Sequence, residues 1–177
     1  MIEVVNINGH DVLKISNAIL GPWRSNFKGE KNKFGDNRRC FYMMLTDEEA
    51  AYLNGEFGIT IKETNPPADS GYSPEKYVKV MVKYHDEPEA KRYDPKLYLI
   101  QDGKPVELDL ETIELLDGTR FDRVDLTLTI YESEVSGKTW YTLYCREGFF
   151  QPSVTSAWAN EYGSMMDIPG ADEEKPF

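Results

Sequence analysis

The sequence predicts a mainly β domain, a small β-barrel or sandwich with two short helices, followed by a C-terminal extension. Short runs of β-branched and aromatic residues recur along the 177 residues, separated by Gly- and Asn-containing turn dipeptides. About seven or more strands of this length and even spacing favour a barrel or sandwich over a parallel α/β sheet. The strand periodicity stops after Phe150. We therefore expect one domain over residues 1–150 and an extension over residues 151–177.

Local patterns predict each element of the N-terminal third. The runs IEVVNI and DVLKISNAIL are expected to be strands on either side of the turn dipeptide Asn8-Gly9. The stretch Gly21–Asn37 is rich in Gly, Lys and Asn, which predicts a long mobile loop, and RRCFYMML then resumes as a strand. TDEEAAYLNG predicts a short helix, because Thr46 and Glu49 have the spacing of a capping box and Gly55 can end it.

The remaining elements are mostly strands. FGITIKE is expected to be a strand, and the loop NPPADSGYSP follows it because two adjacent prolines exclude regular structure. In KYVKVMVKYH, valines alternate with lysines and a methionine, so one face of this strand is apolar and the other basic. KLYLIQDGKPVEL predicts a hairpin around Asp102-Gly103, and LETIELLDG a short helix that ends at Gly118. The last hairpin turns at Ser136-Gly137.

The composition gives no sign of catalysis, of a metal or of a membrane. Cys40 and Cys145 lie far apart in apolar runs and, with His10 and His85, lack the close spacing of a zinc site, so we expect buried thiols. No phosphate-binding glycine loop or nucleophile elbow is present, so we expect no catalytic residue and no cofactor. Neither a signal peptide nor a membrane-spanning run is found, which predicts a cytoplasmic protein. Homo-oligomerisation stays open.

The net charge of −11 would repel nucleic acid, but the charge is unevenly distributed. Between residues 21 and 45, six cations face only two acids, and aromatic residues are interleaved with the cations. Exposed rings stack on unpaired bases, and Lys and Arg bind phosphates without sequence preference. The candidate DNA-binding residues of this stretch are Trp23, Arg24, Phe27, Lys28, Lys31, Lys33, Phe34, Arg38 and Arg39. Each aromatic residue taken alone fits core packing equally well.

The basic face of KYVKVMVKYH is a second candidate surface, with Tyr77, Lys79 and Lys83 as DNA-binding residues. Protection of an edge strand by lysines is the alternative explanation of this face. The Lys91–Tyr93 segment adds two cations and a ring but is diluted by neighbouring acids. Trp140, which shares one strand face with Thr142 and Tyr144, fits either the core or base stacking.

Several segments taken in order resemble bacteriophage-type single-stranded-DNA-binding proteins over most of Ile15–Tyr144. They are ISNAIL, WRSNFKGEKNKFGDNRRCFYMML, LNGEFGITIKE, YVKVMVKY and LDLETIELLDGTRFDRVDLTLTIYESEVSGKTWYTLY. The likeness includes an Asn/Arg-rich loop after the first strand and an E-V-x-G-K hairpin turn, here Glu134–Lys138. It implies an OB-fold-like small barrel with extra strands and hairpins. It also implies sequence-independent, non-enzymatic binding of single-stranded DNA in phage DNA replication, recombination or repair, inside the bacterial host cell.

The C-terminus separately resembles the acidic tip of bacterial single-stranded-DNA-binding proteins, which closes with Asp-Ile-Pro-Phe. Here Asp167-Ile168-Pro169 precedes a second acidic stretch, in which Lys175 interrupts the run. From Asp167 on we expect a disordered tail, because little apolar surface is available to bury. The resemblance implies that the tip recruits replication or recombination proteins and competes with DNA for the basic surface. The partner-binding residues would be Asp172, Glu173, Glu174, Pro176 and Phe177.

Two other functions remain open. An acidic protein-interaction module or DNA-mimic inhibitor would account for the charge of −11, but it leaves the basic stretch without a reason. A metal-dependent nuclease would need carboxylates such as Asp122, Asp125 and Glu132. Asp125 and Glu132 have odd spacing along one strand and would face opposite sides, so no carboxylate cluster is visible.

Overall fold

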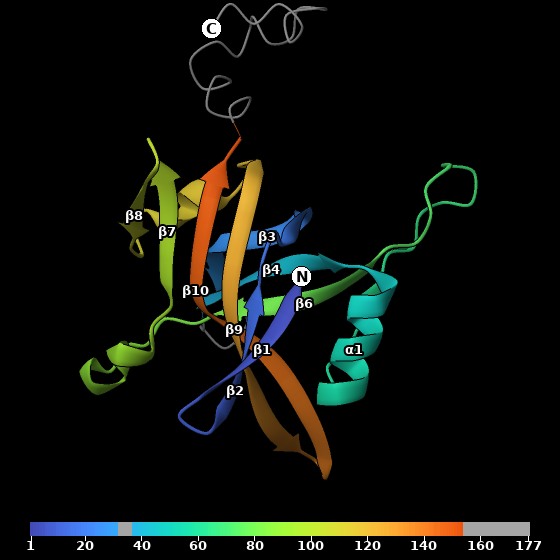
Figure 1. The fold of residues 1–177 in the computed structure, drawn as a ribbon, viewed down its shortest axis with the longest axis horizontal. Coiled ribbons are helices and arrows are strands. Elements are labelled where there is room, and N and C mark those ends of the chain that lie inside the picture. The colour runs from blue at the N-terminus through green and yellow to red at the C-terminus, as the bar shows by residue number, and fades with distance from the viewer. Residues whose placement is uncertain (32–36, 154–177) are drawn as a thin grey trace, which may run out of the picture.

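The strands form one strongly bent sheet (Figure 1). The computed structural model describes residues 1–31 and 37–153, with the backbone alone at 22–24, 31 and 37. The strands are β1 (Ile2–Ile7), β2 (His10–Ile15), β3 (Ile19–Lys31), β4 (Asn37–Leu45), β5 (Lys62–Glu63), β6 (Lys76–Val82), β7 (Lys96–Gln101), β8 (Lys104–Leu108), β9 (Phe121–Val135) and β10 (Lys138–Pro152). The predicted mainly β fold is confirmed. In the described part of the chain no pairing joins β1 to β3, so the sheet is open.

The main path through the sheet runs β1-β2-β9-β10-β6-β4-β3, with β5 beside β6 and the β7–β8 hairpin beside β10. All three hairpin turns predicted from dipeptides are confirmed. The φ angles are 51° and 83° at Asn8-Gly9, 51° and 75° at Asp102-Gly103, and 54° and 76° at Ser136-Gly137. Two-residue turns with both central residues at positive φ match the right-handed twist of antiparallel strands, which is why these dipeptides are good hairpin signals.

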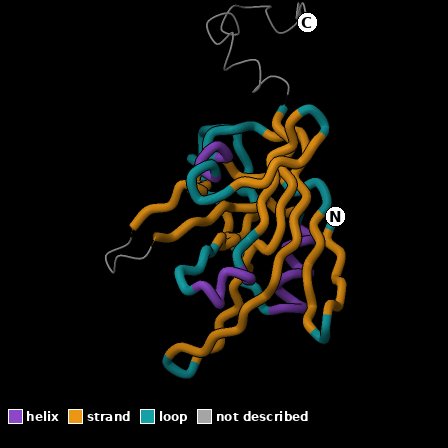
Figure 2. The backbone as a smooth tube through the Cα atoms, turned by 90° about the vertical axis from the view of Figure 1, so that its left-hand side faces the viewer, coloured by secondary structure: helices purple, strands orange, loops and turns teal. Residues whose placement is uncertain are grey.

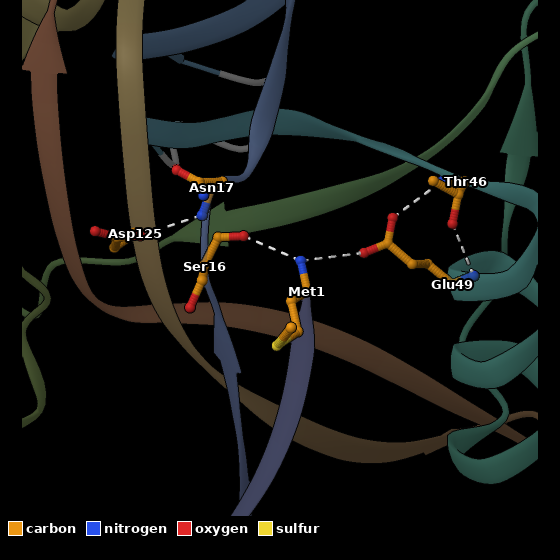
Figure 3. A network of polar contacts seen from close by, with 6 residues as sticks. All are labelled: Met1, Ser16, Asn17, Thr46, Glu49 and Asp125. Atoms are coloured by element: carbon orange, nitrogen blue, oxygen red, sulfur yellow. Dashed lines mark hydrogen bonds and ion pairs between the residues drawn. The ribbon is translucent and has the colours of Figure 1, made fainter.

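The helix α1 (Asp47–Phe57) begins at the predicted capping box. Thr46 Oγ1 accepts a hydrogen bond from the Glu49 amide at 3.1 Å, and Glu49 Oε1 accepts one from the Thr46 amide at 3.0 Å (Figure 3). The helix continues past Gly55 and ends at Gly58, whose φ of 67° is the left-handed C-cap conformation. The expected second helix is the 3₁₀ helix η2 (Ile113–Leu116), and a further 3₁₀ helix, η1 (Pro88–Tyr93), has no counterpart among the predicted elements. Within the described residues, no helix is long and apolar enough to span a membrane.

Two sequence-based expectations about strands are wrong in detail. Most of Gly21–Asn37 lies in β3 and at the start of β4, which pair as a hairpin with register shifts around Asn26. Gly29 has a φ of 86° and donates its amide to Asn26 Oδ1 at 2.8 Å, so the Gly and Asn residues that indicated a loop form bulges within a strand. The FGITIKE segment contributes only the two residues of β5.

The strand β10 organises the sheet because it exchanges one parallel neighbour for another along its length. Leu143 pairs with β6, whereas the residues from Glu147 to Phe150 pair with β7. A register shift between Cys145 and Glu147 separates the two segments. Because β6 and β7 follow one another along the same edge of β10, the chain between them leaves this edge and rejoins it further along, and this connection contains η1.

The hydrophobic core lies on one side of this bent sheet, between the sheet and the segments that cover it. Its largest fully buried side chains are Phe27, Phe41, Phe150, Leu13, Met43, Leu53, Ile59 and Leu97. The opposite side of the sheet is called the outer face below. The predicted tail lies outside the described residues from 154 onward, so the boundary near residue 150 stays a prediction.

Candidate nucleic-acid interface

The strand β6 presents its basic face outward, as the alternating pattern predicts. Val78, Val80 and Val82 are buried in the core, and Lys79 and Met81 lie on the outer face. Lys83 follows the last residue of the strand and is exposed. This strand is not an edge strand, because β4 pairs with one side of it and β5 and β10 with the other. Protection of an edge therefore does not explain its lysines.

The strand β4 alternates in the same way, and this separates its two arginines. Phe41 and Met43 are core residues, so residue 39 points inward with them and residue 38 points outward. Arg38 is exposed, which agrees with the predicted role. Arg39 is only 9% exposed, and its guanidinium lies 5.6 Å from the centroid of the Tyr84 ring. The prediction that Arg39 contacts DNA phosphates is wrong, because the pleat turns it away from the outer face.

Phe27 is a core residue and not a stacking platform, which corrects a second prediction. Its ring is 1% exposed, stacks on Phe41 at 5.4 Å between centroids and meets Phe150 edge-on at 5.8 Å. The Asp117 carboxylate fixes the backbone here by accepting hydrogen bonds from the Phe27 and Lys28 amides, both at 2.9 Å. Lys28 is exposed and stays available to a phosphate.

Tyr77 lies on the outer side of β6, but its ring is covered. It is 7% exposed and packs edge-to-face against Tyr42, with 5.3 Å between the ring centroids. A covered ring cannot stack on a base, so the burial of Tyr77 does not fit its predicted place among the DNA-binding residues. Instead, the Tyr42–Tyr77 pair lies beneath the surface beside Lys79. Lys79 is opposite Tyr42 in the β4–β6 register.

Exposed aromatic rings on the outer face come from β9 and β10. Tyr131 is 59% exposed and Trp140 is 43% exposed. Tyr144 is half-buried and meets Tyr131 edge-on at 5.9 Å between centroids. The Nζ of Lys138 lies 4.5 Å from the centroid of the Trp140 ring, a cation–π contact. The ambiguity over the face of Trp140 is thereby resolved in favour of an exposed position.

These rings lie on a hairpin that extends beyond the rest of the sheet (Figures 1 and 2). We call Tyr131–Thr142 the β9–β10 arm. Its two faces differ in charge: the outer face carries the rings and Lys138, while Glu132 and Glu134 alternate onto the other face. Tyr141 also lies on that other face, against Gly58 at the end of α1. The carboxylates of the arm therefore point away from the aromatic surface.

Lysines surround the middle of the outer face. Cys40 is half-buried there, opposite Met81. Burial raises the pKa of its thiol and the charge of Glu30 adds to the rise, whereas the positive charges of Lys79 and Lys62 act in the opposite direction, which places all three side chains near the thiol. Among the described residues, Lys79, Lys83 and Lys138 form no ion pair. The outer face thus carries unpaired lysines in a protein with a net charge of −11.

Five of the predicted DNA-binding residues have no described side chain. These are Trp23, Arg24, Lys31, Lys33 and Phe34. The backbone of the first three belongs to β3, which forms with β4 a hairpin that projects to the same side in Figure 2 as the β9–β10 arm, with η1 between them in that view. Their role in binding stays a prediction.

A large cavity of about 1730 Å³ lies elsewhere, between the loop 64–75 and the strands β3 and β4. Its lining includes the carboxylates of Asp47, Glu49, Glu63 and Glu75. Asp47 is paired with Lys76 at 3.1 Å, and Glu49 lies 3.8 Å from the N-terminal amine. An acidic lining repels phosphates, so this cavity is not the nucleic-acid site.

The protein family follows from a sequence match. Residues 5–175 match the family described as "Putative phage ssDNA-binding domain". The chain belongs to this family. The resemblance noted from the sequence is thereby confirmed. A search of curated proteins found no match.

Solved structures of two phage proteins resemble this member of the family. The single-stranded DNA-binding protein from bacteriophage Enc34 is 7% identical, with a TM-score of 0.50 over 85% of this chain and 90% of that one. The same protein in complex with ssDNA gives a TM-score of 0.48 at 7% identity, over 84% and 93% of the two chains. The bacteriophage T7 protein gp2.5 gives 0.40 at 8% identity, over 86% and 94%. At 7% identity, the TM-score of 0.50 with the Enc34 protein shows a shared fold alone.

Of the carboxylates considered for a nuclease, Asp125 has structural contacts. Asp125 accepts hydrogen bonds from the Asn17 amide at 3.1 Å and from Arg123 Nε at 2.8 Å (Figure 3 shows the first). Glu132 lies on the opposite face of β9. Across residues 1–31 and 37–153, no group of three or more His, Cys, Asp or Glu side chains is placed to hold a metal ion.

Proposed function

We propose that this protein binds single-stranded DNA without sequence preference, along the outer face of the sheet. Bases stack on Tyr131, Trp140 and Tyr144, and phosphates bind Lys79, Lys83 and Lys138. The exposed cations Lys28 and Arg38 extend this surface along the β3–β4 hairpin, together with the five residues whose side chains are not described.

One observation carries the proposal: the segregation of charge and aromatic rings across the sheet. Exposed rings and lysines share the outer face, whereas Glu132 and Glu134 of the same hairpin face the other way. A mimic of DNA would present its carboxylates outward. Membership of the phage family supports the same function, as does the shared fold of the Enc34 protein, which is itself a single-stranded DNA-binding protein.

The C-terminal extension has a second role in the proposal. Residues 154–177 carry five acids and one lysine, and they are tethered to the basic face. Tethering raises the effective concentration of this polyanion, so it competes with DNA at low salt. Once DNA displaces it, Phe177 and the neighbouring Asp172, Glu173, Glu174 and Pro176 recruit replication or recombination proteins.

Intrinsic tryptophan fluorescence tests DNA binding directly. The protein is titrated with oligo-dT and with duplex DNA of the same length at two salt concentrations. We expect the single strand alone to quench the emission, because Trp140 stacks on bases, and we expect salt to weaken binding. No response to oligo-dT at low salt overturns the proposal and favours the acidic interaction module.

A charge-removal series makes the test specific to the outer face. The double variant Lys79→Gln, Lys83→Gln removes two phosphate contacts, and each such contact contributes about 0.7 to the slope of log K against log salt for single strands. Lys104→Gln is the matched control, because Lys104 is exposed at the β7–β8 turn. An equal salt slope in the double variant and the control would place the binding site elsewhere.

A further inference from the structure

The connection between β6 and β7 places a ring and two arginines together at the border of the outer face. The guanidinium carbon of Arg92 lies 4.8 Å from the centroid of the Tyr93 ring, and that of Arg146 lies 5.9 Å from it. Both distances are within the range of cation–π attraction. Tyr93 is 47% exposed, and both arginines are exposed. We call these three residues the Tyr93 cluster.

The topology of the sheet brings the cluster together. The strand β10 pairs first with β6 and then with β7, and Arg146 lies at the register shift between the two segments. The bulge leaves Arg146 without an opposite residue on β9, which frees its side chain to point outward. The β6–β7 connection passes this point, so its last helical residue, Tyr93, meets Arg146 at the bulge.

Both guanidiniums lack a carboxylate partner among the described residues, although acidic residues surround them in the sequence. Asp94, the carboxylate that follows Tyr93 in sequence, is turned to His85: its Oδ1 accepts a hydrogen bond from the His85 amide at 2.8 Å and lies 3.0 Å from His85 Nδ1. Guanidiniums without an ion-pair partner are suited to phosphates.

The cluster also continues the aromatic surface. Arg146 follows Tyr144 at the next outward position of β10, and Tyr144 lies beside Met81 of β6. Lys83, two residues beyond Met81, begins the β6–β7 connection. A single-stranded nucleic acid that lies along these residues reaches the Tyr93 cluster where it leaves the outer face.

We propose that the Tyr93 cluster is a phosphate-binding site that holds the backbone of a single-stranded nucleic acid where it leaves the outer face. This inference rests on the proposed function. Arg92 and Arg146 bind the phosphates. Tyr93 is a positioning residue that orders both guanidiniums by cation–π contact, so fewer side-chain rotamers are lost on binding.

The experiment measures affinity for dT oligonucleotides of about 4 to 16 nucleotides, the range of site sizes found for single OB folds. The variants are Arg92→Ala, Arg146→Ala, the double variant, and Lys104→Ala as a control away from the cluster. We expect the double variant to bind the shortest oligonucleotides as the wild type does and to lose affinity only above a threshold length. Its salt slope with long oligonucleotides should fall by about 1.4, the value for two phosphates.

The role of Tyr93 has its own readout. Tyr93→Phe keeps the ring and should retain full affinity, whereas Tyr93→Leu should lose affinity for long oligonucleotides only. If the wild type and the double arginine variant have equal affinities and salt slopes at every length, the Tyr93 cluster is not a phosphate-binding site. That result leaves the proposed function intact. If the wild type binds no oligo-dT at all, the proposed function itself fails. Unchanged urea unfolding and unchanged affinity for short oligonucleotides show that each variant is folded.

Discussion

Cys40 lies in the middle of the proposed binding surface and serves as a chemical probe of it. Its thiol pKa is raised by burial, so at pH 7 little of the reactive thiolate is present, and alkylation by iodoacetamide should speed up as the pH rises toward 9. Saturating oligo-dT should slow this reaction, because the strand covers the thiol and its phosphates disfavour the thiolate. Burial raises the pKa of Cys145 to about 12, so Cys145 should stay unlabelled in the folded protein. Labelling of Cys40 at the same rate with and without DNA would contradict the proposed surface.

Gly148 is required at its position because the core leaves no room for a side chain. A Cβ atom there would lie 2.7 Å from the buried Phe150 ring and 3.2 Å from Leu126 and Leu97 side-chain atoms. Gly148→Ala should therefore destabilise the protein by about 1–3 kcal/mol in urea unfolding, the usual cost of overpacking. Gly55→Ala is the control, since a Cβ there meets nothing within 4 Å and removal of a helical glycine stabilises by up to about 1 kcal/mol. Equal stability of the two variants would show that the core side chains around residue 148 move to make room for the added methyl group.

At the scale of elements, local signals predict the hairpins, the helix cap and the facing of β6, because each depends on residues close in sequence. The capping box of Thr46 and Glu49 and the alternation of valines and lysines need no tertiary information. The sequence of β3 predicts a loop because a bulged strand and a loop use the same Gly and Asn residues. The inward position of Arg39 has no local signal of its own, since the pleat of β4 is set by Phe41 and Met43 packing in the core.

The contact between Tyr93 and Arg146 could not be predicted from the sequence. Tyr93 and Arg146 meet only because β10 changes its parallel neighbour at a bulge. No local sequence pattern predicts which residue contacts the side chain at a bulge. The period-2 continuation from Thr142 through Tyr144 would have placed Arg146 on the outer face, which is the one local signal available.

The β9–β10 arm permits a test within a single element, since its two faces have different partners. Trp140→Ala and Tyr131→Ala should each weaken oligo-dT binding by about 1–3 kcal/mol, the usual contribution of one base–aromatic stack. Tyr141→Ala is the matched control, because Tyr141 lies on the other face against Gly58. It should lower the stability in urea and leave DNA affinity unchanged, as measured by fluorescence anisotropy of labelled oligo-dT. If all three variants lose the same affinity, the arm acts through its stability and not through stacking.

At the scale of the whole molecule, the net charge of −11 is compatible with DNA binding because unpaired lysines lie on the outer face while many of the carboxylates lie elsewhere. Acidic side chains line the cavity beside the loop 64–75, and two glutamates occupy the inner face of the arm. The lysines of the outer face are left unpaired within the described residues. A large negative charge elsewhere on the molecule weakens DNA binding at low salt, and screening reduces this repulsion over a distance of about 10 Å at 0.1 M salt.

The extension contributes to this balance, and two kinds of variant separate its two proposed roles. Neutralising the tip by Asp172→Asn, Glu173→Gln and Glu174→Gln removes the competing charges, so oligo-dT affinity should rise at low salt and converge with the wild type as salt increases. Phe177→Ala keeps these charges and should leave DNA affinity unchanged while abolishing binding of a replication or recombination partner. Anisotropy titrations over a salt series measure the first effect, and pull-down of purified candidate partners measures the second. Unaltered affinity of the neutralised variant at every salt concentration would refute competition by the tail. Recruitment through Phe177 would be unaffected by that result, because it depends on the ring of Phe177 and not on the basic face.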